Sequence, residues 1–173
     1  MQSFALAIAT LVLLTACTDD PGPIEPSPTR IEPNLAAPTM PKAAESKSSK
    51  GQIAFVRHVV SMLNFAVGSG STDELEELFD PACEACGEYA ARVRSDNADR
   101  GDVDGFNWSV SKGRVLDGDL VEVSIEADPY KKNNPETGES TQVRAATYQL
   151  GFKLENRSDR WVVSDLYVPE GAK

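Results

Sequence analysis

The sequence is poor in the residues on which catalysis and metal binding usually depend. It contains one histidine, His58, and three cysteines. A serine–histidine–acid triad would have to use His58, and no Gly-x-Ser-x-Gly nucleophile elbow accompanies it. A structural zinc site needs four ligands, and Cys83 and Cys86 have no second ligand pair nearby. The sequence therefore predicts no catalytic set, no metal site and no cofactor.

The chain also lacks a long hydrophobic run and a surplus of basic residues. The apolar stretch 4–14 is shorter than the roughly 20 residues of a membrane-spanning helix, but it suits the h-region of a signal peptide. With 17 Lys and Arg against 27 Asp and Glu, the formal net charge is −10. Nucleic-acid binding needs clustered basic residues, so nucleic acid is not an expected partner. Attraction to anionic lipid headgroups is disfavoured for the same reason.

The apolar stretch ends in Leu14-Thr15-Ala16-Cys17, which is typical of a bacterial lipobox. Residues 1–16 would be removed as a lipoprotein signal peptide, and Cys17 would be acylated, for example with palmitate. Two acyl chains make such an attachment stable. Residues 1–3 contain none of the basic residues usual at the start of a signal peptide, for which a misassigned start codon is our explanation. The expected location is the outer face of the plasma membrane of a Gram-positive cell envelope.

Residues 17–50 have the composition of a tether. Little in this segment can be buried to offset the entropy of ordering it, so we expect a disordered, proline-rich spacer. Seven of the eleven prolines of the chain lie here: Pro21, Pro23, Pro26, Pro28, Pro33, Pro38 and Pro41. Residues 51–168 are then expected to form one domain, because about 120 residues suffice for a single core, and residues 169–173 form a tail.

The predicted domain opens with helices. In residues 52–67, apolar side chains recur every three or four positions and fill much of two helix faces, so this helix should be heavily buried. Thr72 is expected to cap a second helix, residues 73–79, whose early acidic side chains suit the helix dipole. Residues 83–95 form a third predicted helix, and the polar run 96–105 separates the helices from the later half of the domain.

The remainder of the domain alternates between apolar and polar residues, as antiparallel strands do. Asp117-Gly118 is a strong hairpin signal, and residues 128–139, which contain Pro129, Asn134 and Gly138, are predicted to form a loop. The predicted strands are residues 106–115, 120–127, 141–155 and 161–168. Helices followed by antiparallel strands define an α+β domain, in which about three helices pack in a curved sheet of about four strands.

Cys83 and Cys86 are an even pair once Cys17 is assigned to the lipid. Because an exported chain meets an oxidising environment, we expect a disulfide, which would stabilise so short a loop by roughly 2 kcal/mol. A thiol–disulfide oxidoreductase is the alternative, since a helix N-terminus acidifies a cysteine. Against it, Glu84 would raise the pKa of a neighbouring thiol, and the motif does not follow a βαβ-type strand.

Several short segments resemble an actinobacterial lipoprotein family, the domain-of-unknown-function family 6318. The matching pieces are Met40-Pro41, Gly51, Ala54-Phe55-Val56-Arg57, Asn64 with Ala66, Leu75, and Cys83-Glu84-Ala85-Cys86. The helix–strand order and the closing Arg160-Trp161-Val162-Val163 are similar to the cone-like fold of the nuclear-transport-factor-2-like superfamily. The resemblance covers about residues 38–168. It implies an envelope location and a cone-like fold, and it implies no activity because the family has none established.

The resemblance also suggests where a site would lie. Some cone-like domains are enzymes that use an Asp or His base in the mouth of the cone, where Asp104, Tyr148 and Asp165 are conceivable linings here. Such domains also pair through their sheets, which implies a homodimer. We expect a noncatalytic domain that binds an unknown small molecule or an envelope protein. The alternative is an envelope enzyme, acting through Cys83 and Cys86 or by acid–base chemistry in the cone.

Overall fold

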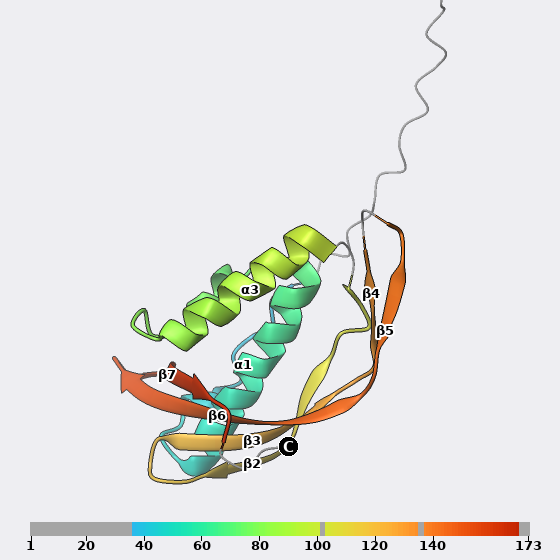
Figure 1. The fold of residues 1–173 in the computed structure, drawn as a ribbon. Helices are drawn as coiled ribbons and strands as arrows, with labels where there is room; N and C mark the ends of the chain where they lie inside the picture. Colours follow the sequence, from blue (N-terminus) through green and yellow to red (C-terminus); the bar gives the residue numbers. More distant parts are fainter. Residues whose placement is uncertain (1–35, 101–102, 135–136, 170–173) are drawn as a thin grey trace, which may run out of the picture. The chain divides into compact units, whose positions relative to one another are not determined.

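The computed structural model describes residues 36–100, 103–134 and 137–169 (Figure 1). The chain divides into two compact units, residues 1–33 and 34–173, and only the second contains described residues. The predicted signal peptide and Cys17 lie outside the described residues. Within the described part, no helix has both the length and the apolar character needed to cross a membrane.

The described elements follow the predicted order of helices before strands (Figure 1). They are η1 (Lys42–Glu45), α1 (Ser49–Ser69), α2 (Asp73–Glu76), α3 (Glu84–Arg100), β1 (Val103–Asp104), β2 (Trp108–Val115), β3 (Leu120–Ala127), β4 (Tyr130–Asn133), β5 (Ser140–Val143), β6 (Ala146–Arg157) and β7 (Arg160–Tyr167). Strands β2-β3-β6-β7 form an antiparallel four-stranded sheet, and β1-β4-β5 form a smaller one. The predicted α+β class, with three α-helices and a four-stranded sheet, is confirmed.

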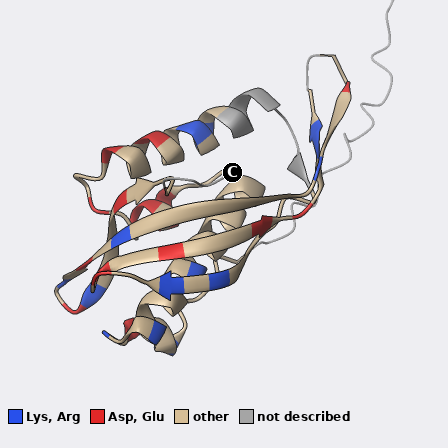
Figure 2. Cartoon of the chain, turned by 60° about the horizontal axis from the view of Figure 1, so that its bottom comes forward, with Lys and Arg blue, Asp and Glu red and all other residues tan. Residues whose placement is uncertain are grey.

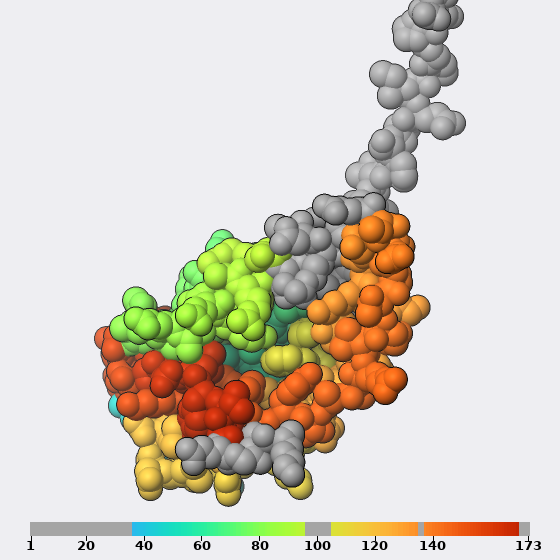
Figure 3. Space-filling model, in the orientation of Figure 1, coloured from blue at the N-terminus to red at the C-terminus, as the bar shows by residue number. Residues whose placement is uncertain are grey.

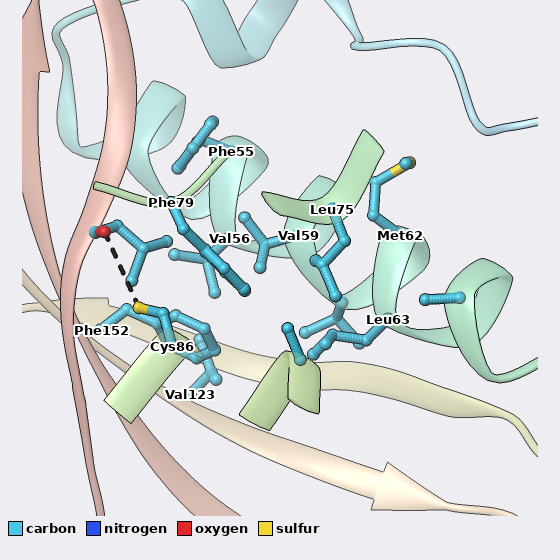
Figure 4. Close-up of a cluster of buried hydrophobic side chains, with 14 of the residues drawn as sticks. Phe55, Val56, Val59, Met62, Leu63, Leu75, Phe79, Cys86, Val123 and Phe152 are labelled. Atoms are coloured by element: carbon cyan, nitrogen blue, oxygen red, sulfur yellow. Dashed lines mark hydrogen bonds between the residues drawn. The ribbon is translucent and has the colours of Figure 1, made fainter. Parts of the chain in front are cut away.

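Helix α1 is the centre of the fold. The side chain of Ser48 accepts a hydrogen bond from the Gly51 amide at its start, and Gly70, at φ 79°, ends it in the left-handed conformation that glycine adopts without strain. Its apolar faces meet the inner face of the sheet, as the labelled side chains in Figure 4 show. The core residues from α1 include Phe55, Val56, Val59, Val60, Leu63 and Ala66, and those from the sheet include Val121, Val123, Ile125, Phe152, Leu154 and Val163.

The fold extends further toward the N-terminus than the predicted boundary at residue 51. Ala44 in η1 is only 2% exposed, and Ala37 and Met40 pack against the core. The indole Nε1 of Trp161 donates to the Ser46 carbonyl oxygen at 3.0 Å, and Lys47 pairs with Asp159 at 2.9 Å. We call residues 36–48 the N-terminal strap. The prediction of a disordered tether is wrong for the strap, because three small apolar residues and a few polar contacts anchor it.

The two later helices differ from their predicted bounds. Helix α2 is shorter than predicted, and Thr72 does not cap it with its side chain. The Thr72 hydroxyl instead lies 2.6 Å from both the Glu76 carboxylate and the Arg94 guanidinium, so it links α2 to α3. Helix α3 continues beyond the predicted end at residue 95 to Arg100. The polar residues there contain no proline or glycine before Gly101, so nothing in the sequence breaks the helix earlier.

The predicted loop over residues 128–139 is wrong for residues 130–133, which form β4. Strand β4 pairs with β5, and the turn that joins them is closed by a hydrogen bond from the Gly138 amide to the Asn134 carbonyl oxygen (2.9 Å). The predicted strand 141–155 is correspondingly divided, because β5 belongs to the smaller sheet and β6 begins at Ala146. The hairpin at Asp117-Gly118 is confirmed: β2 and β3 pair on either side of it, and Gly118 has a φ of 62°.

Candidate functional site

An apolar pocket lies between the helices and the inner face of the four-stranded sheet. Its volume is about 260 Å³. In the space-filling view, a hollow opens between α3, the C-terminal strand and the hairpin of β4 and β5 (Figure 3). The lining residues come from five elements and the segments beside them: Val59, Leu63, Phe79, Ala85, Tyr89, Trp108, Leu150, Gly151, Phe152, Leu166, Tyr167 and Val168.

Each wall of the pocket follows from a simple local pattern. Val59 and Leu63 are four positions apart on α1 and so lie on the same helix face. Leu150 and Phe152 are two positions apart on β6 and so point to the same side of the sheet. Because Leu166 pairs with Phe152, β7 continues this surface. The pocket is thus the part of the apolar core that the helices leave uncovered.

Asn64 fixes the position of Trp108 at the mouth of the pocket. Its amide nitrogen donates to the Trp108 carbonyl oxygen, and its amide oxygen accepts from the Trp108 backbone N–H, both at 2.8 Å. These two bonds satisfy backbone groups at the start of edge strand β2, and they tie that strand to α1. Because Asn64 fixes the backbone of Trp108, it also fixes the point from which the indole ring extends.

Trp108 is one of four aromatic side chains that contact one another in a row. We call them the aromatic rim: Tyr130, Phe106, Trp108 and Tyr148. Neighbouring ring centroids are 5.3 to 5.6 Å apart, with tilted or edge-on geometry, as aromatic pairs prefer. Tyr148 is 43% exposed, and Val168, which lines the pocket, is 69% exposed. Among the described residues, these are two of the three large hydrophobic side chains that remain exposed, so apolar surface is concentrated here.

The lining of the pocket is almost wholly apolar. Its described residues include no Asp, Glu, Lys, Arg or His, and Tyr89 is the lining residue that brings a hydroxyl group. The ring of Tyr167 lies over Gly151, on the outer face of the sheet. No group of His, Cys, Asp or Glu side chains in the described ranges is arranged to hold a metal ion. What the pocket offers is apolar area, worth roughly 25 cal/mol per Å² of surface removed from water.

The structure does not bring together Asp104, Tyr148 and Asp165, the three residues suggested as linings of the cone mouth. Tyr148 contributes to the aromatic rim through its contact with Trp108. Asp165 pairs with Lys153, on the face of the sheet opposite Phe152 and Leu166, so its carboxylate is directed away from the pocket. Asp104 lies in β1 of the smaller sheet, and its side chain is outside the described part.

His58 lies outside the pocket, on another side of α1. It is buried, and burial lowers the pKa of its imidazole, which is therefore neutral near pH 7. It faces a second hollow of about 530 Å³, which is bounded by the N-terminal strap, α1 and α2.

Cys83 and Cys86 form a disulfide at the start of α3. Cys83 is 5% exposed and Cys86 is fully buried. The Cys86 sulfur lies 3.8 Å from the Val163 carbonyl oxygen (dashed in Figure 4), and a disulfide sulfur carries no proton, so we treat this approach as packing. Thiol–disulfide exchange needs an accessible sulfur, so the burial of this bond favours a structural role.

Asp80 anchors the turn that leads into this disulfide. Its Oδ1 accepts from the Ala82 amide at 2.8 Å, its Oδ2 forms an ion pair with Arg157, and its carbonyl oxygen accepts from the Cys83 amide at 2.9 Å. The preceding segment pairs with β7 through Leu78 and Val163. The disulfide therefore secures the start of α3 to a turn that is already attached to the sheet.

The strands that line the pocket were predicted from the sequence, but the pocket was not. Trp108, Leu150 and Leu166 lie within the predicted strands, and nothing in their spacing distinguishes a filled core from an open one. The available signal was the position of the aromatic residues 106, 108, 130 and 148 near strand ends. Because they are distant in sequence, their contact depends on the pairing of the strands.

The fold and the pocket together define an α+β domain with an apolar cavity between its helices and its sheet, the arrangement of the cone-like fold. The chain belongs to a family of unknown function (DUF6318), whose model matches residues 28–166. No curated protein matches the sequence.

Solved structures resemble the fold only distantly. The Kfla4162 protein from Kribbella flavida is 9% identical, with a TM-score of 0.48, and the match covers 70% of this chain and 93% of that one. An NTF2-like family protein from Streptomyces avermitilis is 13% identical, with a TM-score of 0.45 and coverages of 69% and 95%. The intermembrane space region of the chloroplast protein ARC6 is 15% identical, with a TM-score of 0.48 and coverages of 66% and 93%. Such similarity supports no inference about activity.

Proposed function

We propose that this chain is a lipid-anchored, extracytoplasmic lipoprotein whose domain binds an apolar small molecule without catalysis. The observation that carries the binding role is the apolar pocket with the aromatic rim beside it, in which Tyr148 is exposed and the other three rings are half-buried. Pockets that hold small ligands are typically lined by hydrophobic and aromatic side chains, with few polar groups. The sequence Leu14-Thr15-Ala16-Cys17 after an apolar leader supports the lipid anchor.

Filling the pocket is expected to weaken ligand binding without harming the fold. Ala85 lines the pocket from α3, so a phenyl ring placed there by Ala85→Phe would occupy the cavity. The probe is the neutral fluorophore N-phenyl-1-naphthylamine, titrated into residues 34–173, the compact unit that contains the core. We expect its affinity to fall by about tenfold or more, the factor that corresponds to about 1.4 kcal/mol.

Ala91→Phe is the matched control. Ala91 is on the same helix, is exposed and does not line the pocket, so this variant should bind the probe as the parent chain does. The proposal is contradicted if both variants lose binding equally, or if the parent chain does not bind the probe.

Native mass spectrometry of the protein purified from the host envelope then tests whether a natural ligand is bound. A mass excess that is lost on denaturation identifies it, whereas a bare mass favours a protein partner.

Replacing Cys17 is expected to release the protein from membranes. The Cys17→Ala chain has no thiol to acylate, so fatty-acid labelling should disappear and the protein should move to the soluble fraction, because two acyl chains supply the stable attachment. Cys83→Ala with Cys86→Ala is the control, since it removes the other two cysteines and should leave labelling intact. Unchanged membrane association of the Cys17→Ala chain would show that the anchor lies elsewhere.

A further inference from the structure

A polar pocket, separate from the apolar pocket and from the hollow beside His58, lies at the edge of the four-stranded sheet, around β2. Its volume is about 580 Å³, and three basic side chains line it beside one acidic side chain. Figure 2 shows blue segments along this edge strand and red segments on the next strand. The lining residues are Arg57, Ser111, Lys112, Gly113, Arg114, Glu122, Ser124 and Gln149. None of them lines the apolar pocket.

Two irregularities in β2 bring the basic side chains together. The pairing of β2 with β3 shifts between Val110 and Lys112, which leaves Ser111 as the extra residue of a β-bulge. After this bulge, Lys112 and Arg114 both point to the outer face of the sheet. At the intervening Gly113, which faces inward, an added Cβ would lie 3.0 Å from Cγ2 of Ile53, so the absent side chain allows α1 to approach.

This approach places Arg57 beside the two basic residues of β2. Arg57 follows Ile53 by four positions and is therefore one helical turn further along the same side of α1. The three cations therefore line one pocket, although Arg57 and Lys112 are more than fifty positions apart in the sequence. Bulges are frequent where a side chain must be redirected toward a binding site.

Only one of the three cations is neutralised within the described part of the chain. Arg114 donates from Nη2 and Nε to the same Glu122 oxygen, at 2.6 and 3.0 Å. No ion pair between described residues involves Arg57 or Lys112. The pocket thus carries two uncompensated positive charges in a chain whose formal net charge is −10.

Neutral hydrogen-bonding groups complete the pocket. The Ser124 hydroxyl and the Gln149 side-chain amide contact one another at 2.8 and 3.1 Å, and Ser111 is hydrogen-bonded to the Ser124 carbonyl oxygen at 3.3 Å. Each serine hydroxyl donates its one proton within the pocket, to the Ser124 carbonyl oxygen or to Gln149. The Gln149 amide has a second N–H that can donate to an oxygen atom of a ligand. Guanidinium groups match the paired oxygens of a phosphate group, and a lysine supplies a point charge to the same group.

We propose that this pocket binds a phosphate group, with Arg57 and Lys112 as its main charged contacts. The site is distinct from the apolar pocket, so this proposal is independent of the proposed function. The phosphate group could be free phosphate or part of a larger molecule. Glu122 limits the affinity, because it occupies Arg114 and repels an anion.

The test is an NMR titration of the full chain in a nonionic detergent, observed at the amides of β2. The probes are inorganic phosphate and glycerol 3-phosphate, with glycerol and acetate as comparisons. Arg57→Gln and Lys112→Gln are each expected to weaken phosphate binding by up to about fivefold, as the loss of one solvent-exposed ion pair does. Glu122→Gln is expected to tighten phosphate binding about threefold, because the change frees Arg114 to contact the phosphate.

The matched controls are Arg92→Gln and Lys153→Gln, which remove exposed cations from α3 and β6 outside the pocket. They should leave the affinity unchanged, and each variant is checked for an unaltered melting temperature. Tighter binding of glycerol 3-phosphate than of inorganic phosphate would assign the site to an organic phosphate. The proposal is overturned if phosphate does not shift the β2 amides, if acetate binds as well, or if the control variants weaken binding equally.

Discussion

Truncating Phe55 to alanine is expected to lower the free energy of unfolding by about 3–5 kcal/mol, the range found for buried phenylalanines. Phe55 is 1% exposed and lies in the first half of α1, where the helix meets the rest of the core (Figure 4). Removing its ring leaves a cavity that close-packed neighbours cannot fill. The urea concentration at the midpoint of unfolding should fall, while the dependence of the free energy of unfolding on urea concentration stays the same.

Phe106→Ala is the control for this prediction. Phe106 is partly exposed in the aromatic rim, where it contacts Trp108 and Tyr130. Losing such a pair should cost about 1 kcal/mol. If both variants lost the same stability, the core would not be centred on α1 as described.

Two glycine-to-alanine changes are expected to alter stability in opposite directions. In α1, Gly51 lies against Ser46 of the N-terminal strap, and an added Cβ would overlap the Ser46 carbonyl oxygen and lie 2.8 Å from its Cβ. Because backbone must move, Gly51→Ala should cost about 1–3 kcal/mol. In α3, Gly87 has nothing within 4 Å of an added Cβ. Gly87→Ala should therefore raise stability by about 0.5–1 kcal/mol through the better helix propensity of alanine.

Thermal unfolding of the two variants tests whether Gly51→Ala lowers stability and Gly87→Ala raises it. Limited proteolysis tests whether the loss of stability comes from displacement of the strap. The Gly51→Ala chain should be cut faster within residues 36–48, since the strap is the element displaced, whereas Gly87→Ala should leave this rate unchanged. A stabilised Gly51→Ala chain would mean that the strap does not pack on α1.

Strong, regular patterns were sufficient to predict the centre of the fold. The bounds of β3 agree with the prediction at both ends, because its inward Val121, Val123 and Ile125 alternate with polar residues after a clear hairpin signal. Helix α1 was recognised from the spacing of its apolar residues, and its ends differ by only a few positions. These elements carry most of the core.

The misses fall where the pattern is weak. Strands β4 and β5 are short and polar, with Lys131, Lys132 and Gln142 among their residues, so their pairing left no apolar alternation to detect. The N-terminal strap is proline-rich, and its anchoring depends on Trp161, which is more than one hundred residues away. Both depend on partners that the local sequence does not reveal.

The candidate sites were harder to predict than the elements for the same reason. The apolar pocket exists because five elements stop short of one another, and no single segment contains that information. The polar pocket depends on a bulge at Ser111 and on the close approach that Gly113 allows. The net charge of the chain indicates an acidic protein, and it gives no sign of the local basic cluster of Arg57, Lys112 and Arg114.

The N-terminal strap has a consequence for distance. A chain anchored at Cys17 and free up to residue 50 could extend for more than 100 Å, at roughly 3.4 Å per residue. Since Ala37 in the strap already packs against the core, the segment between it and Cys17 can extend only to about 70 Å on the same estimate. If the lipid holds Cys17, the domain works in a shell close to the membrane surface. Partners and ligands must then be found within that height.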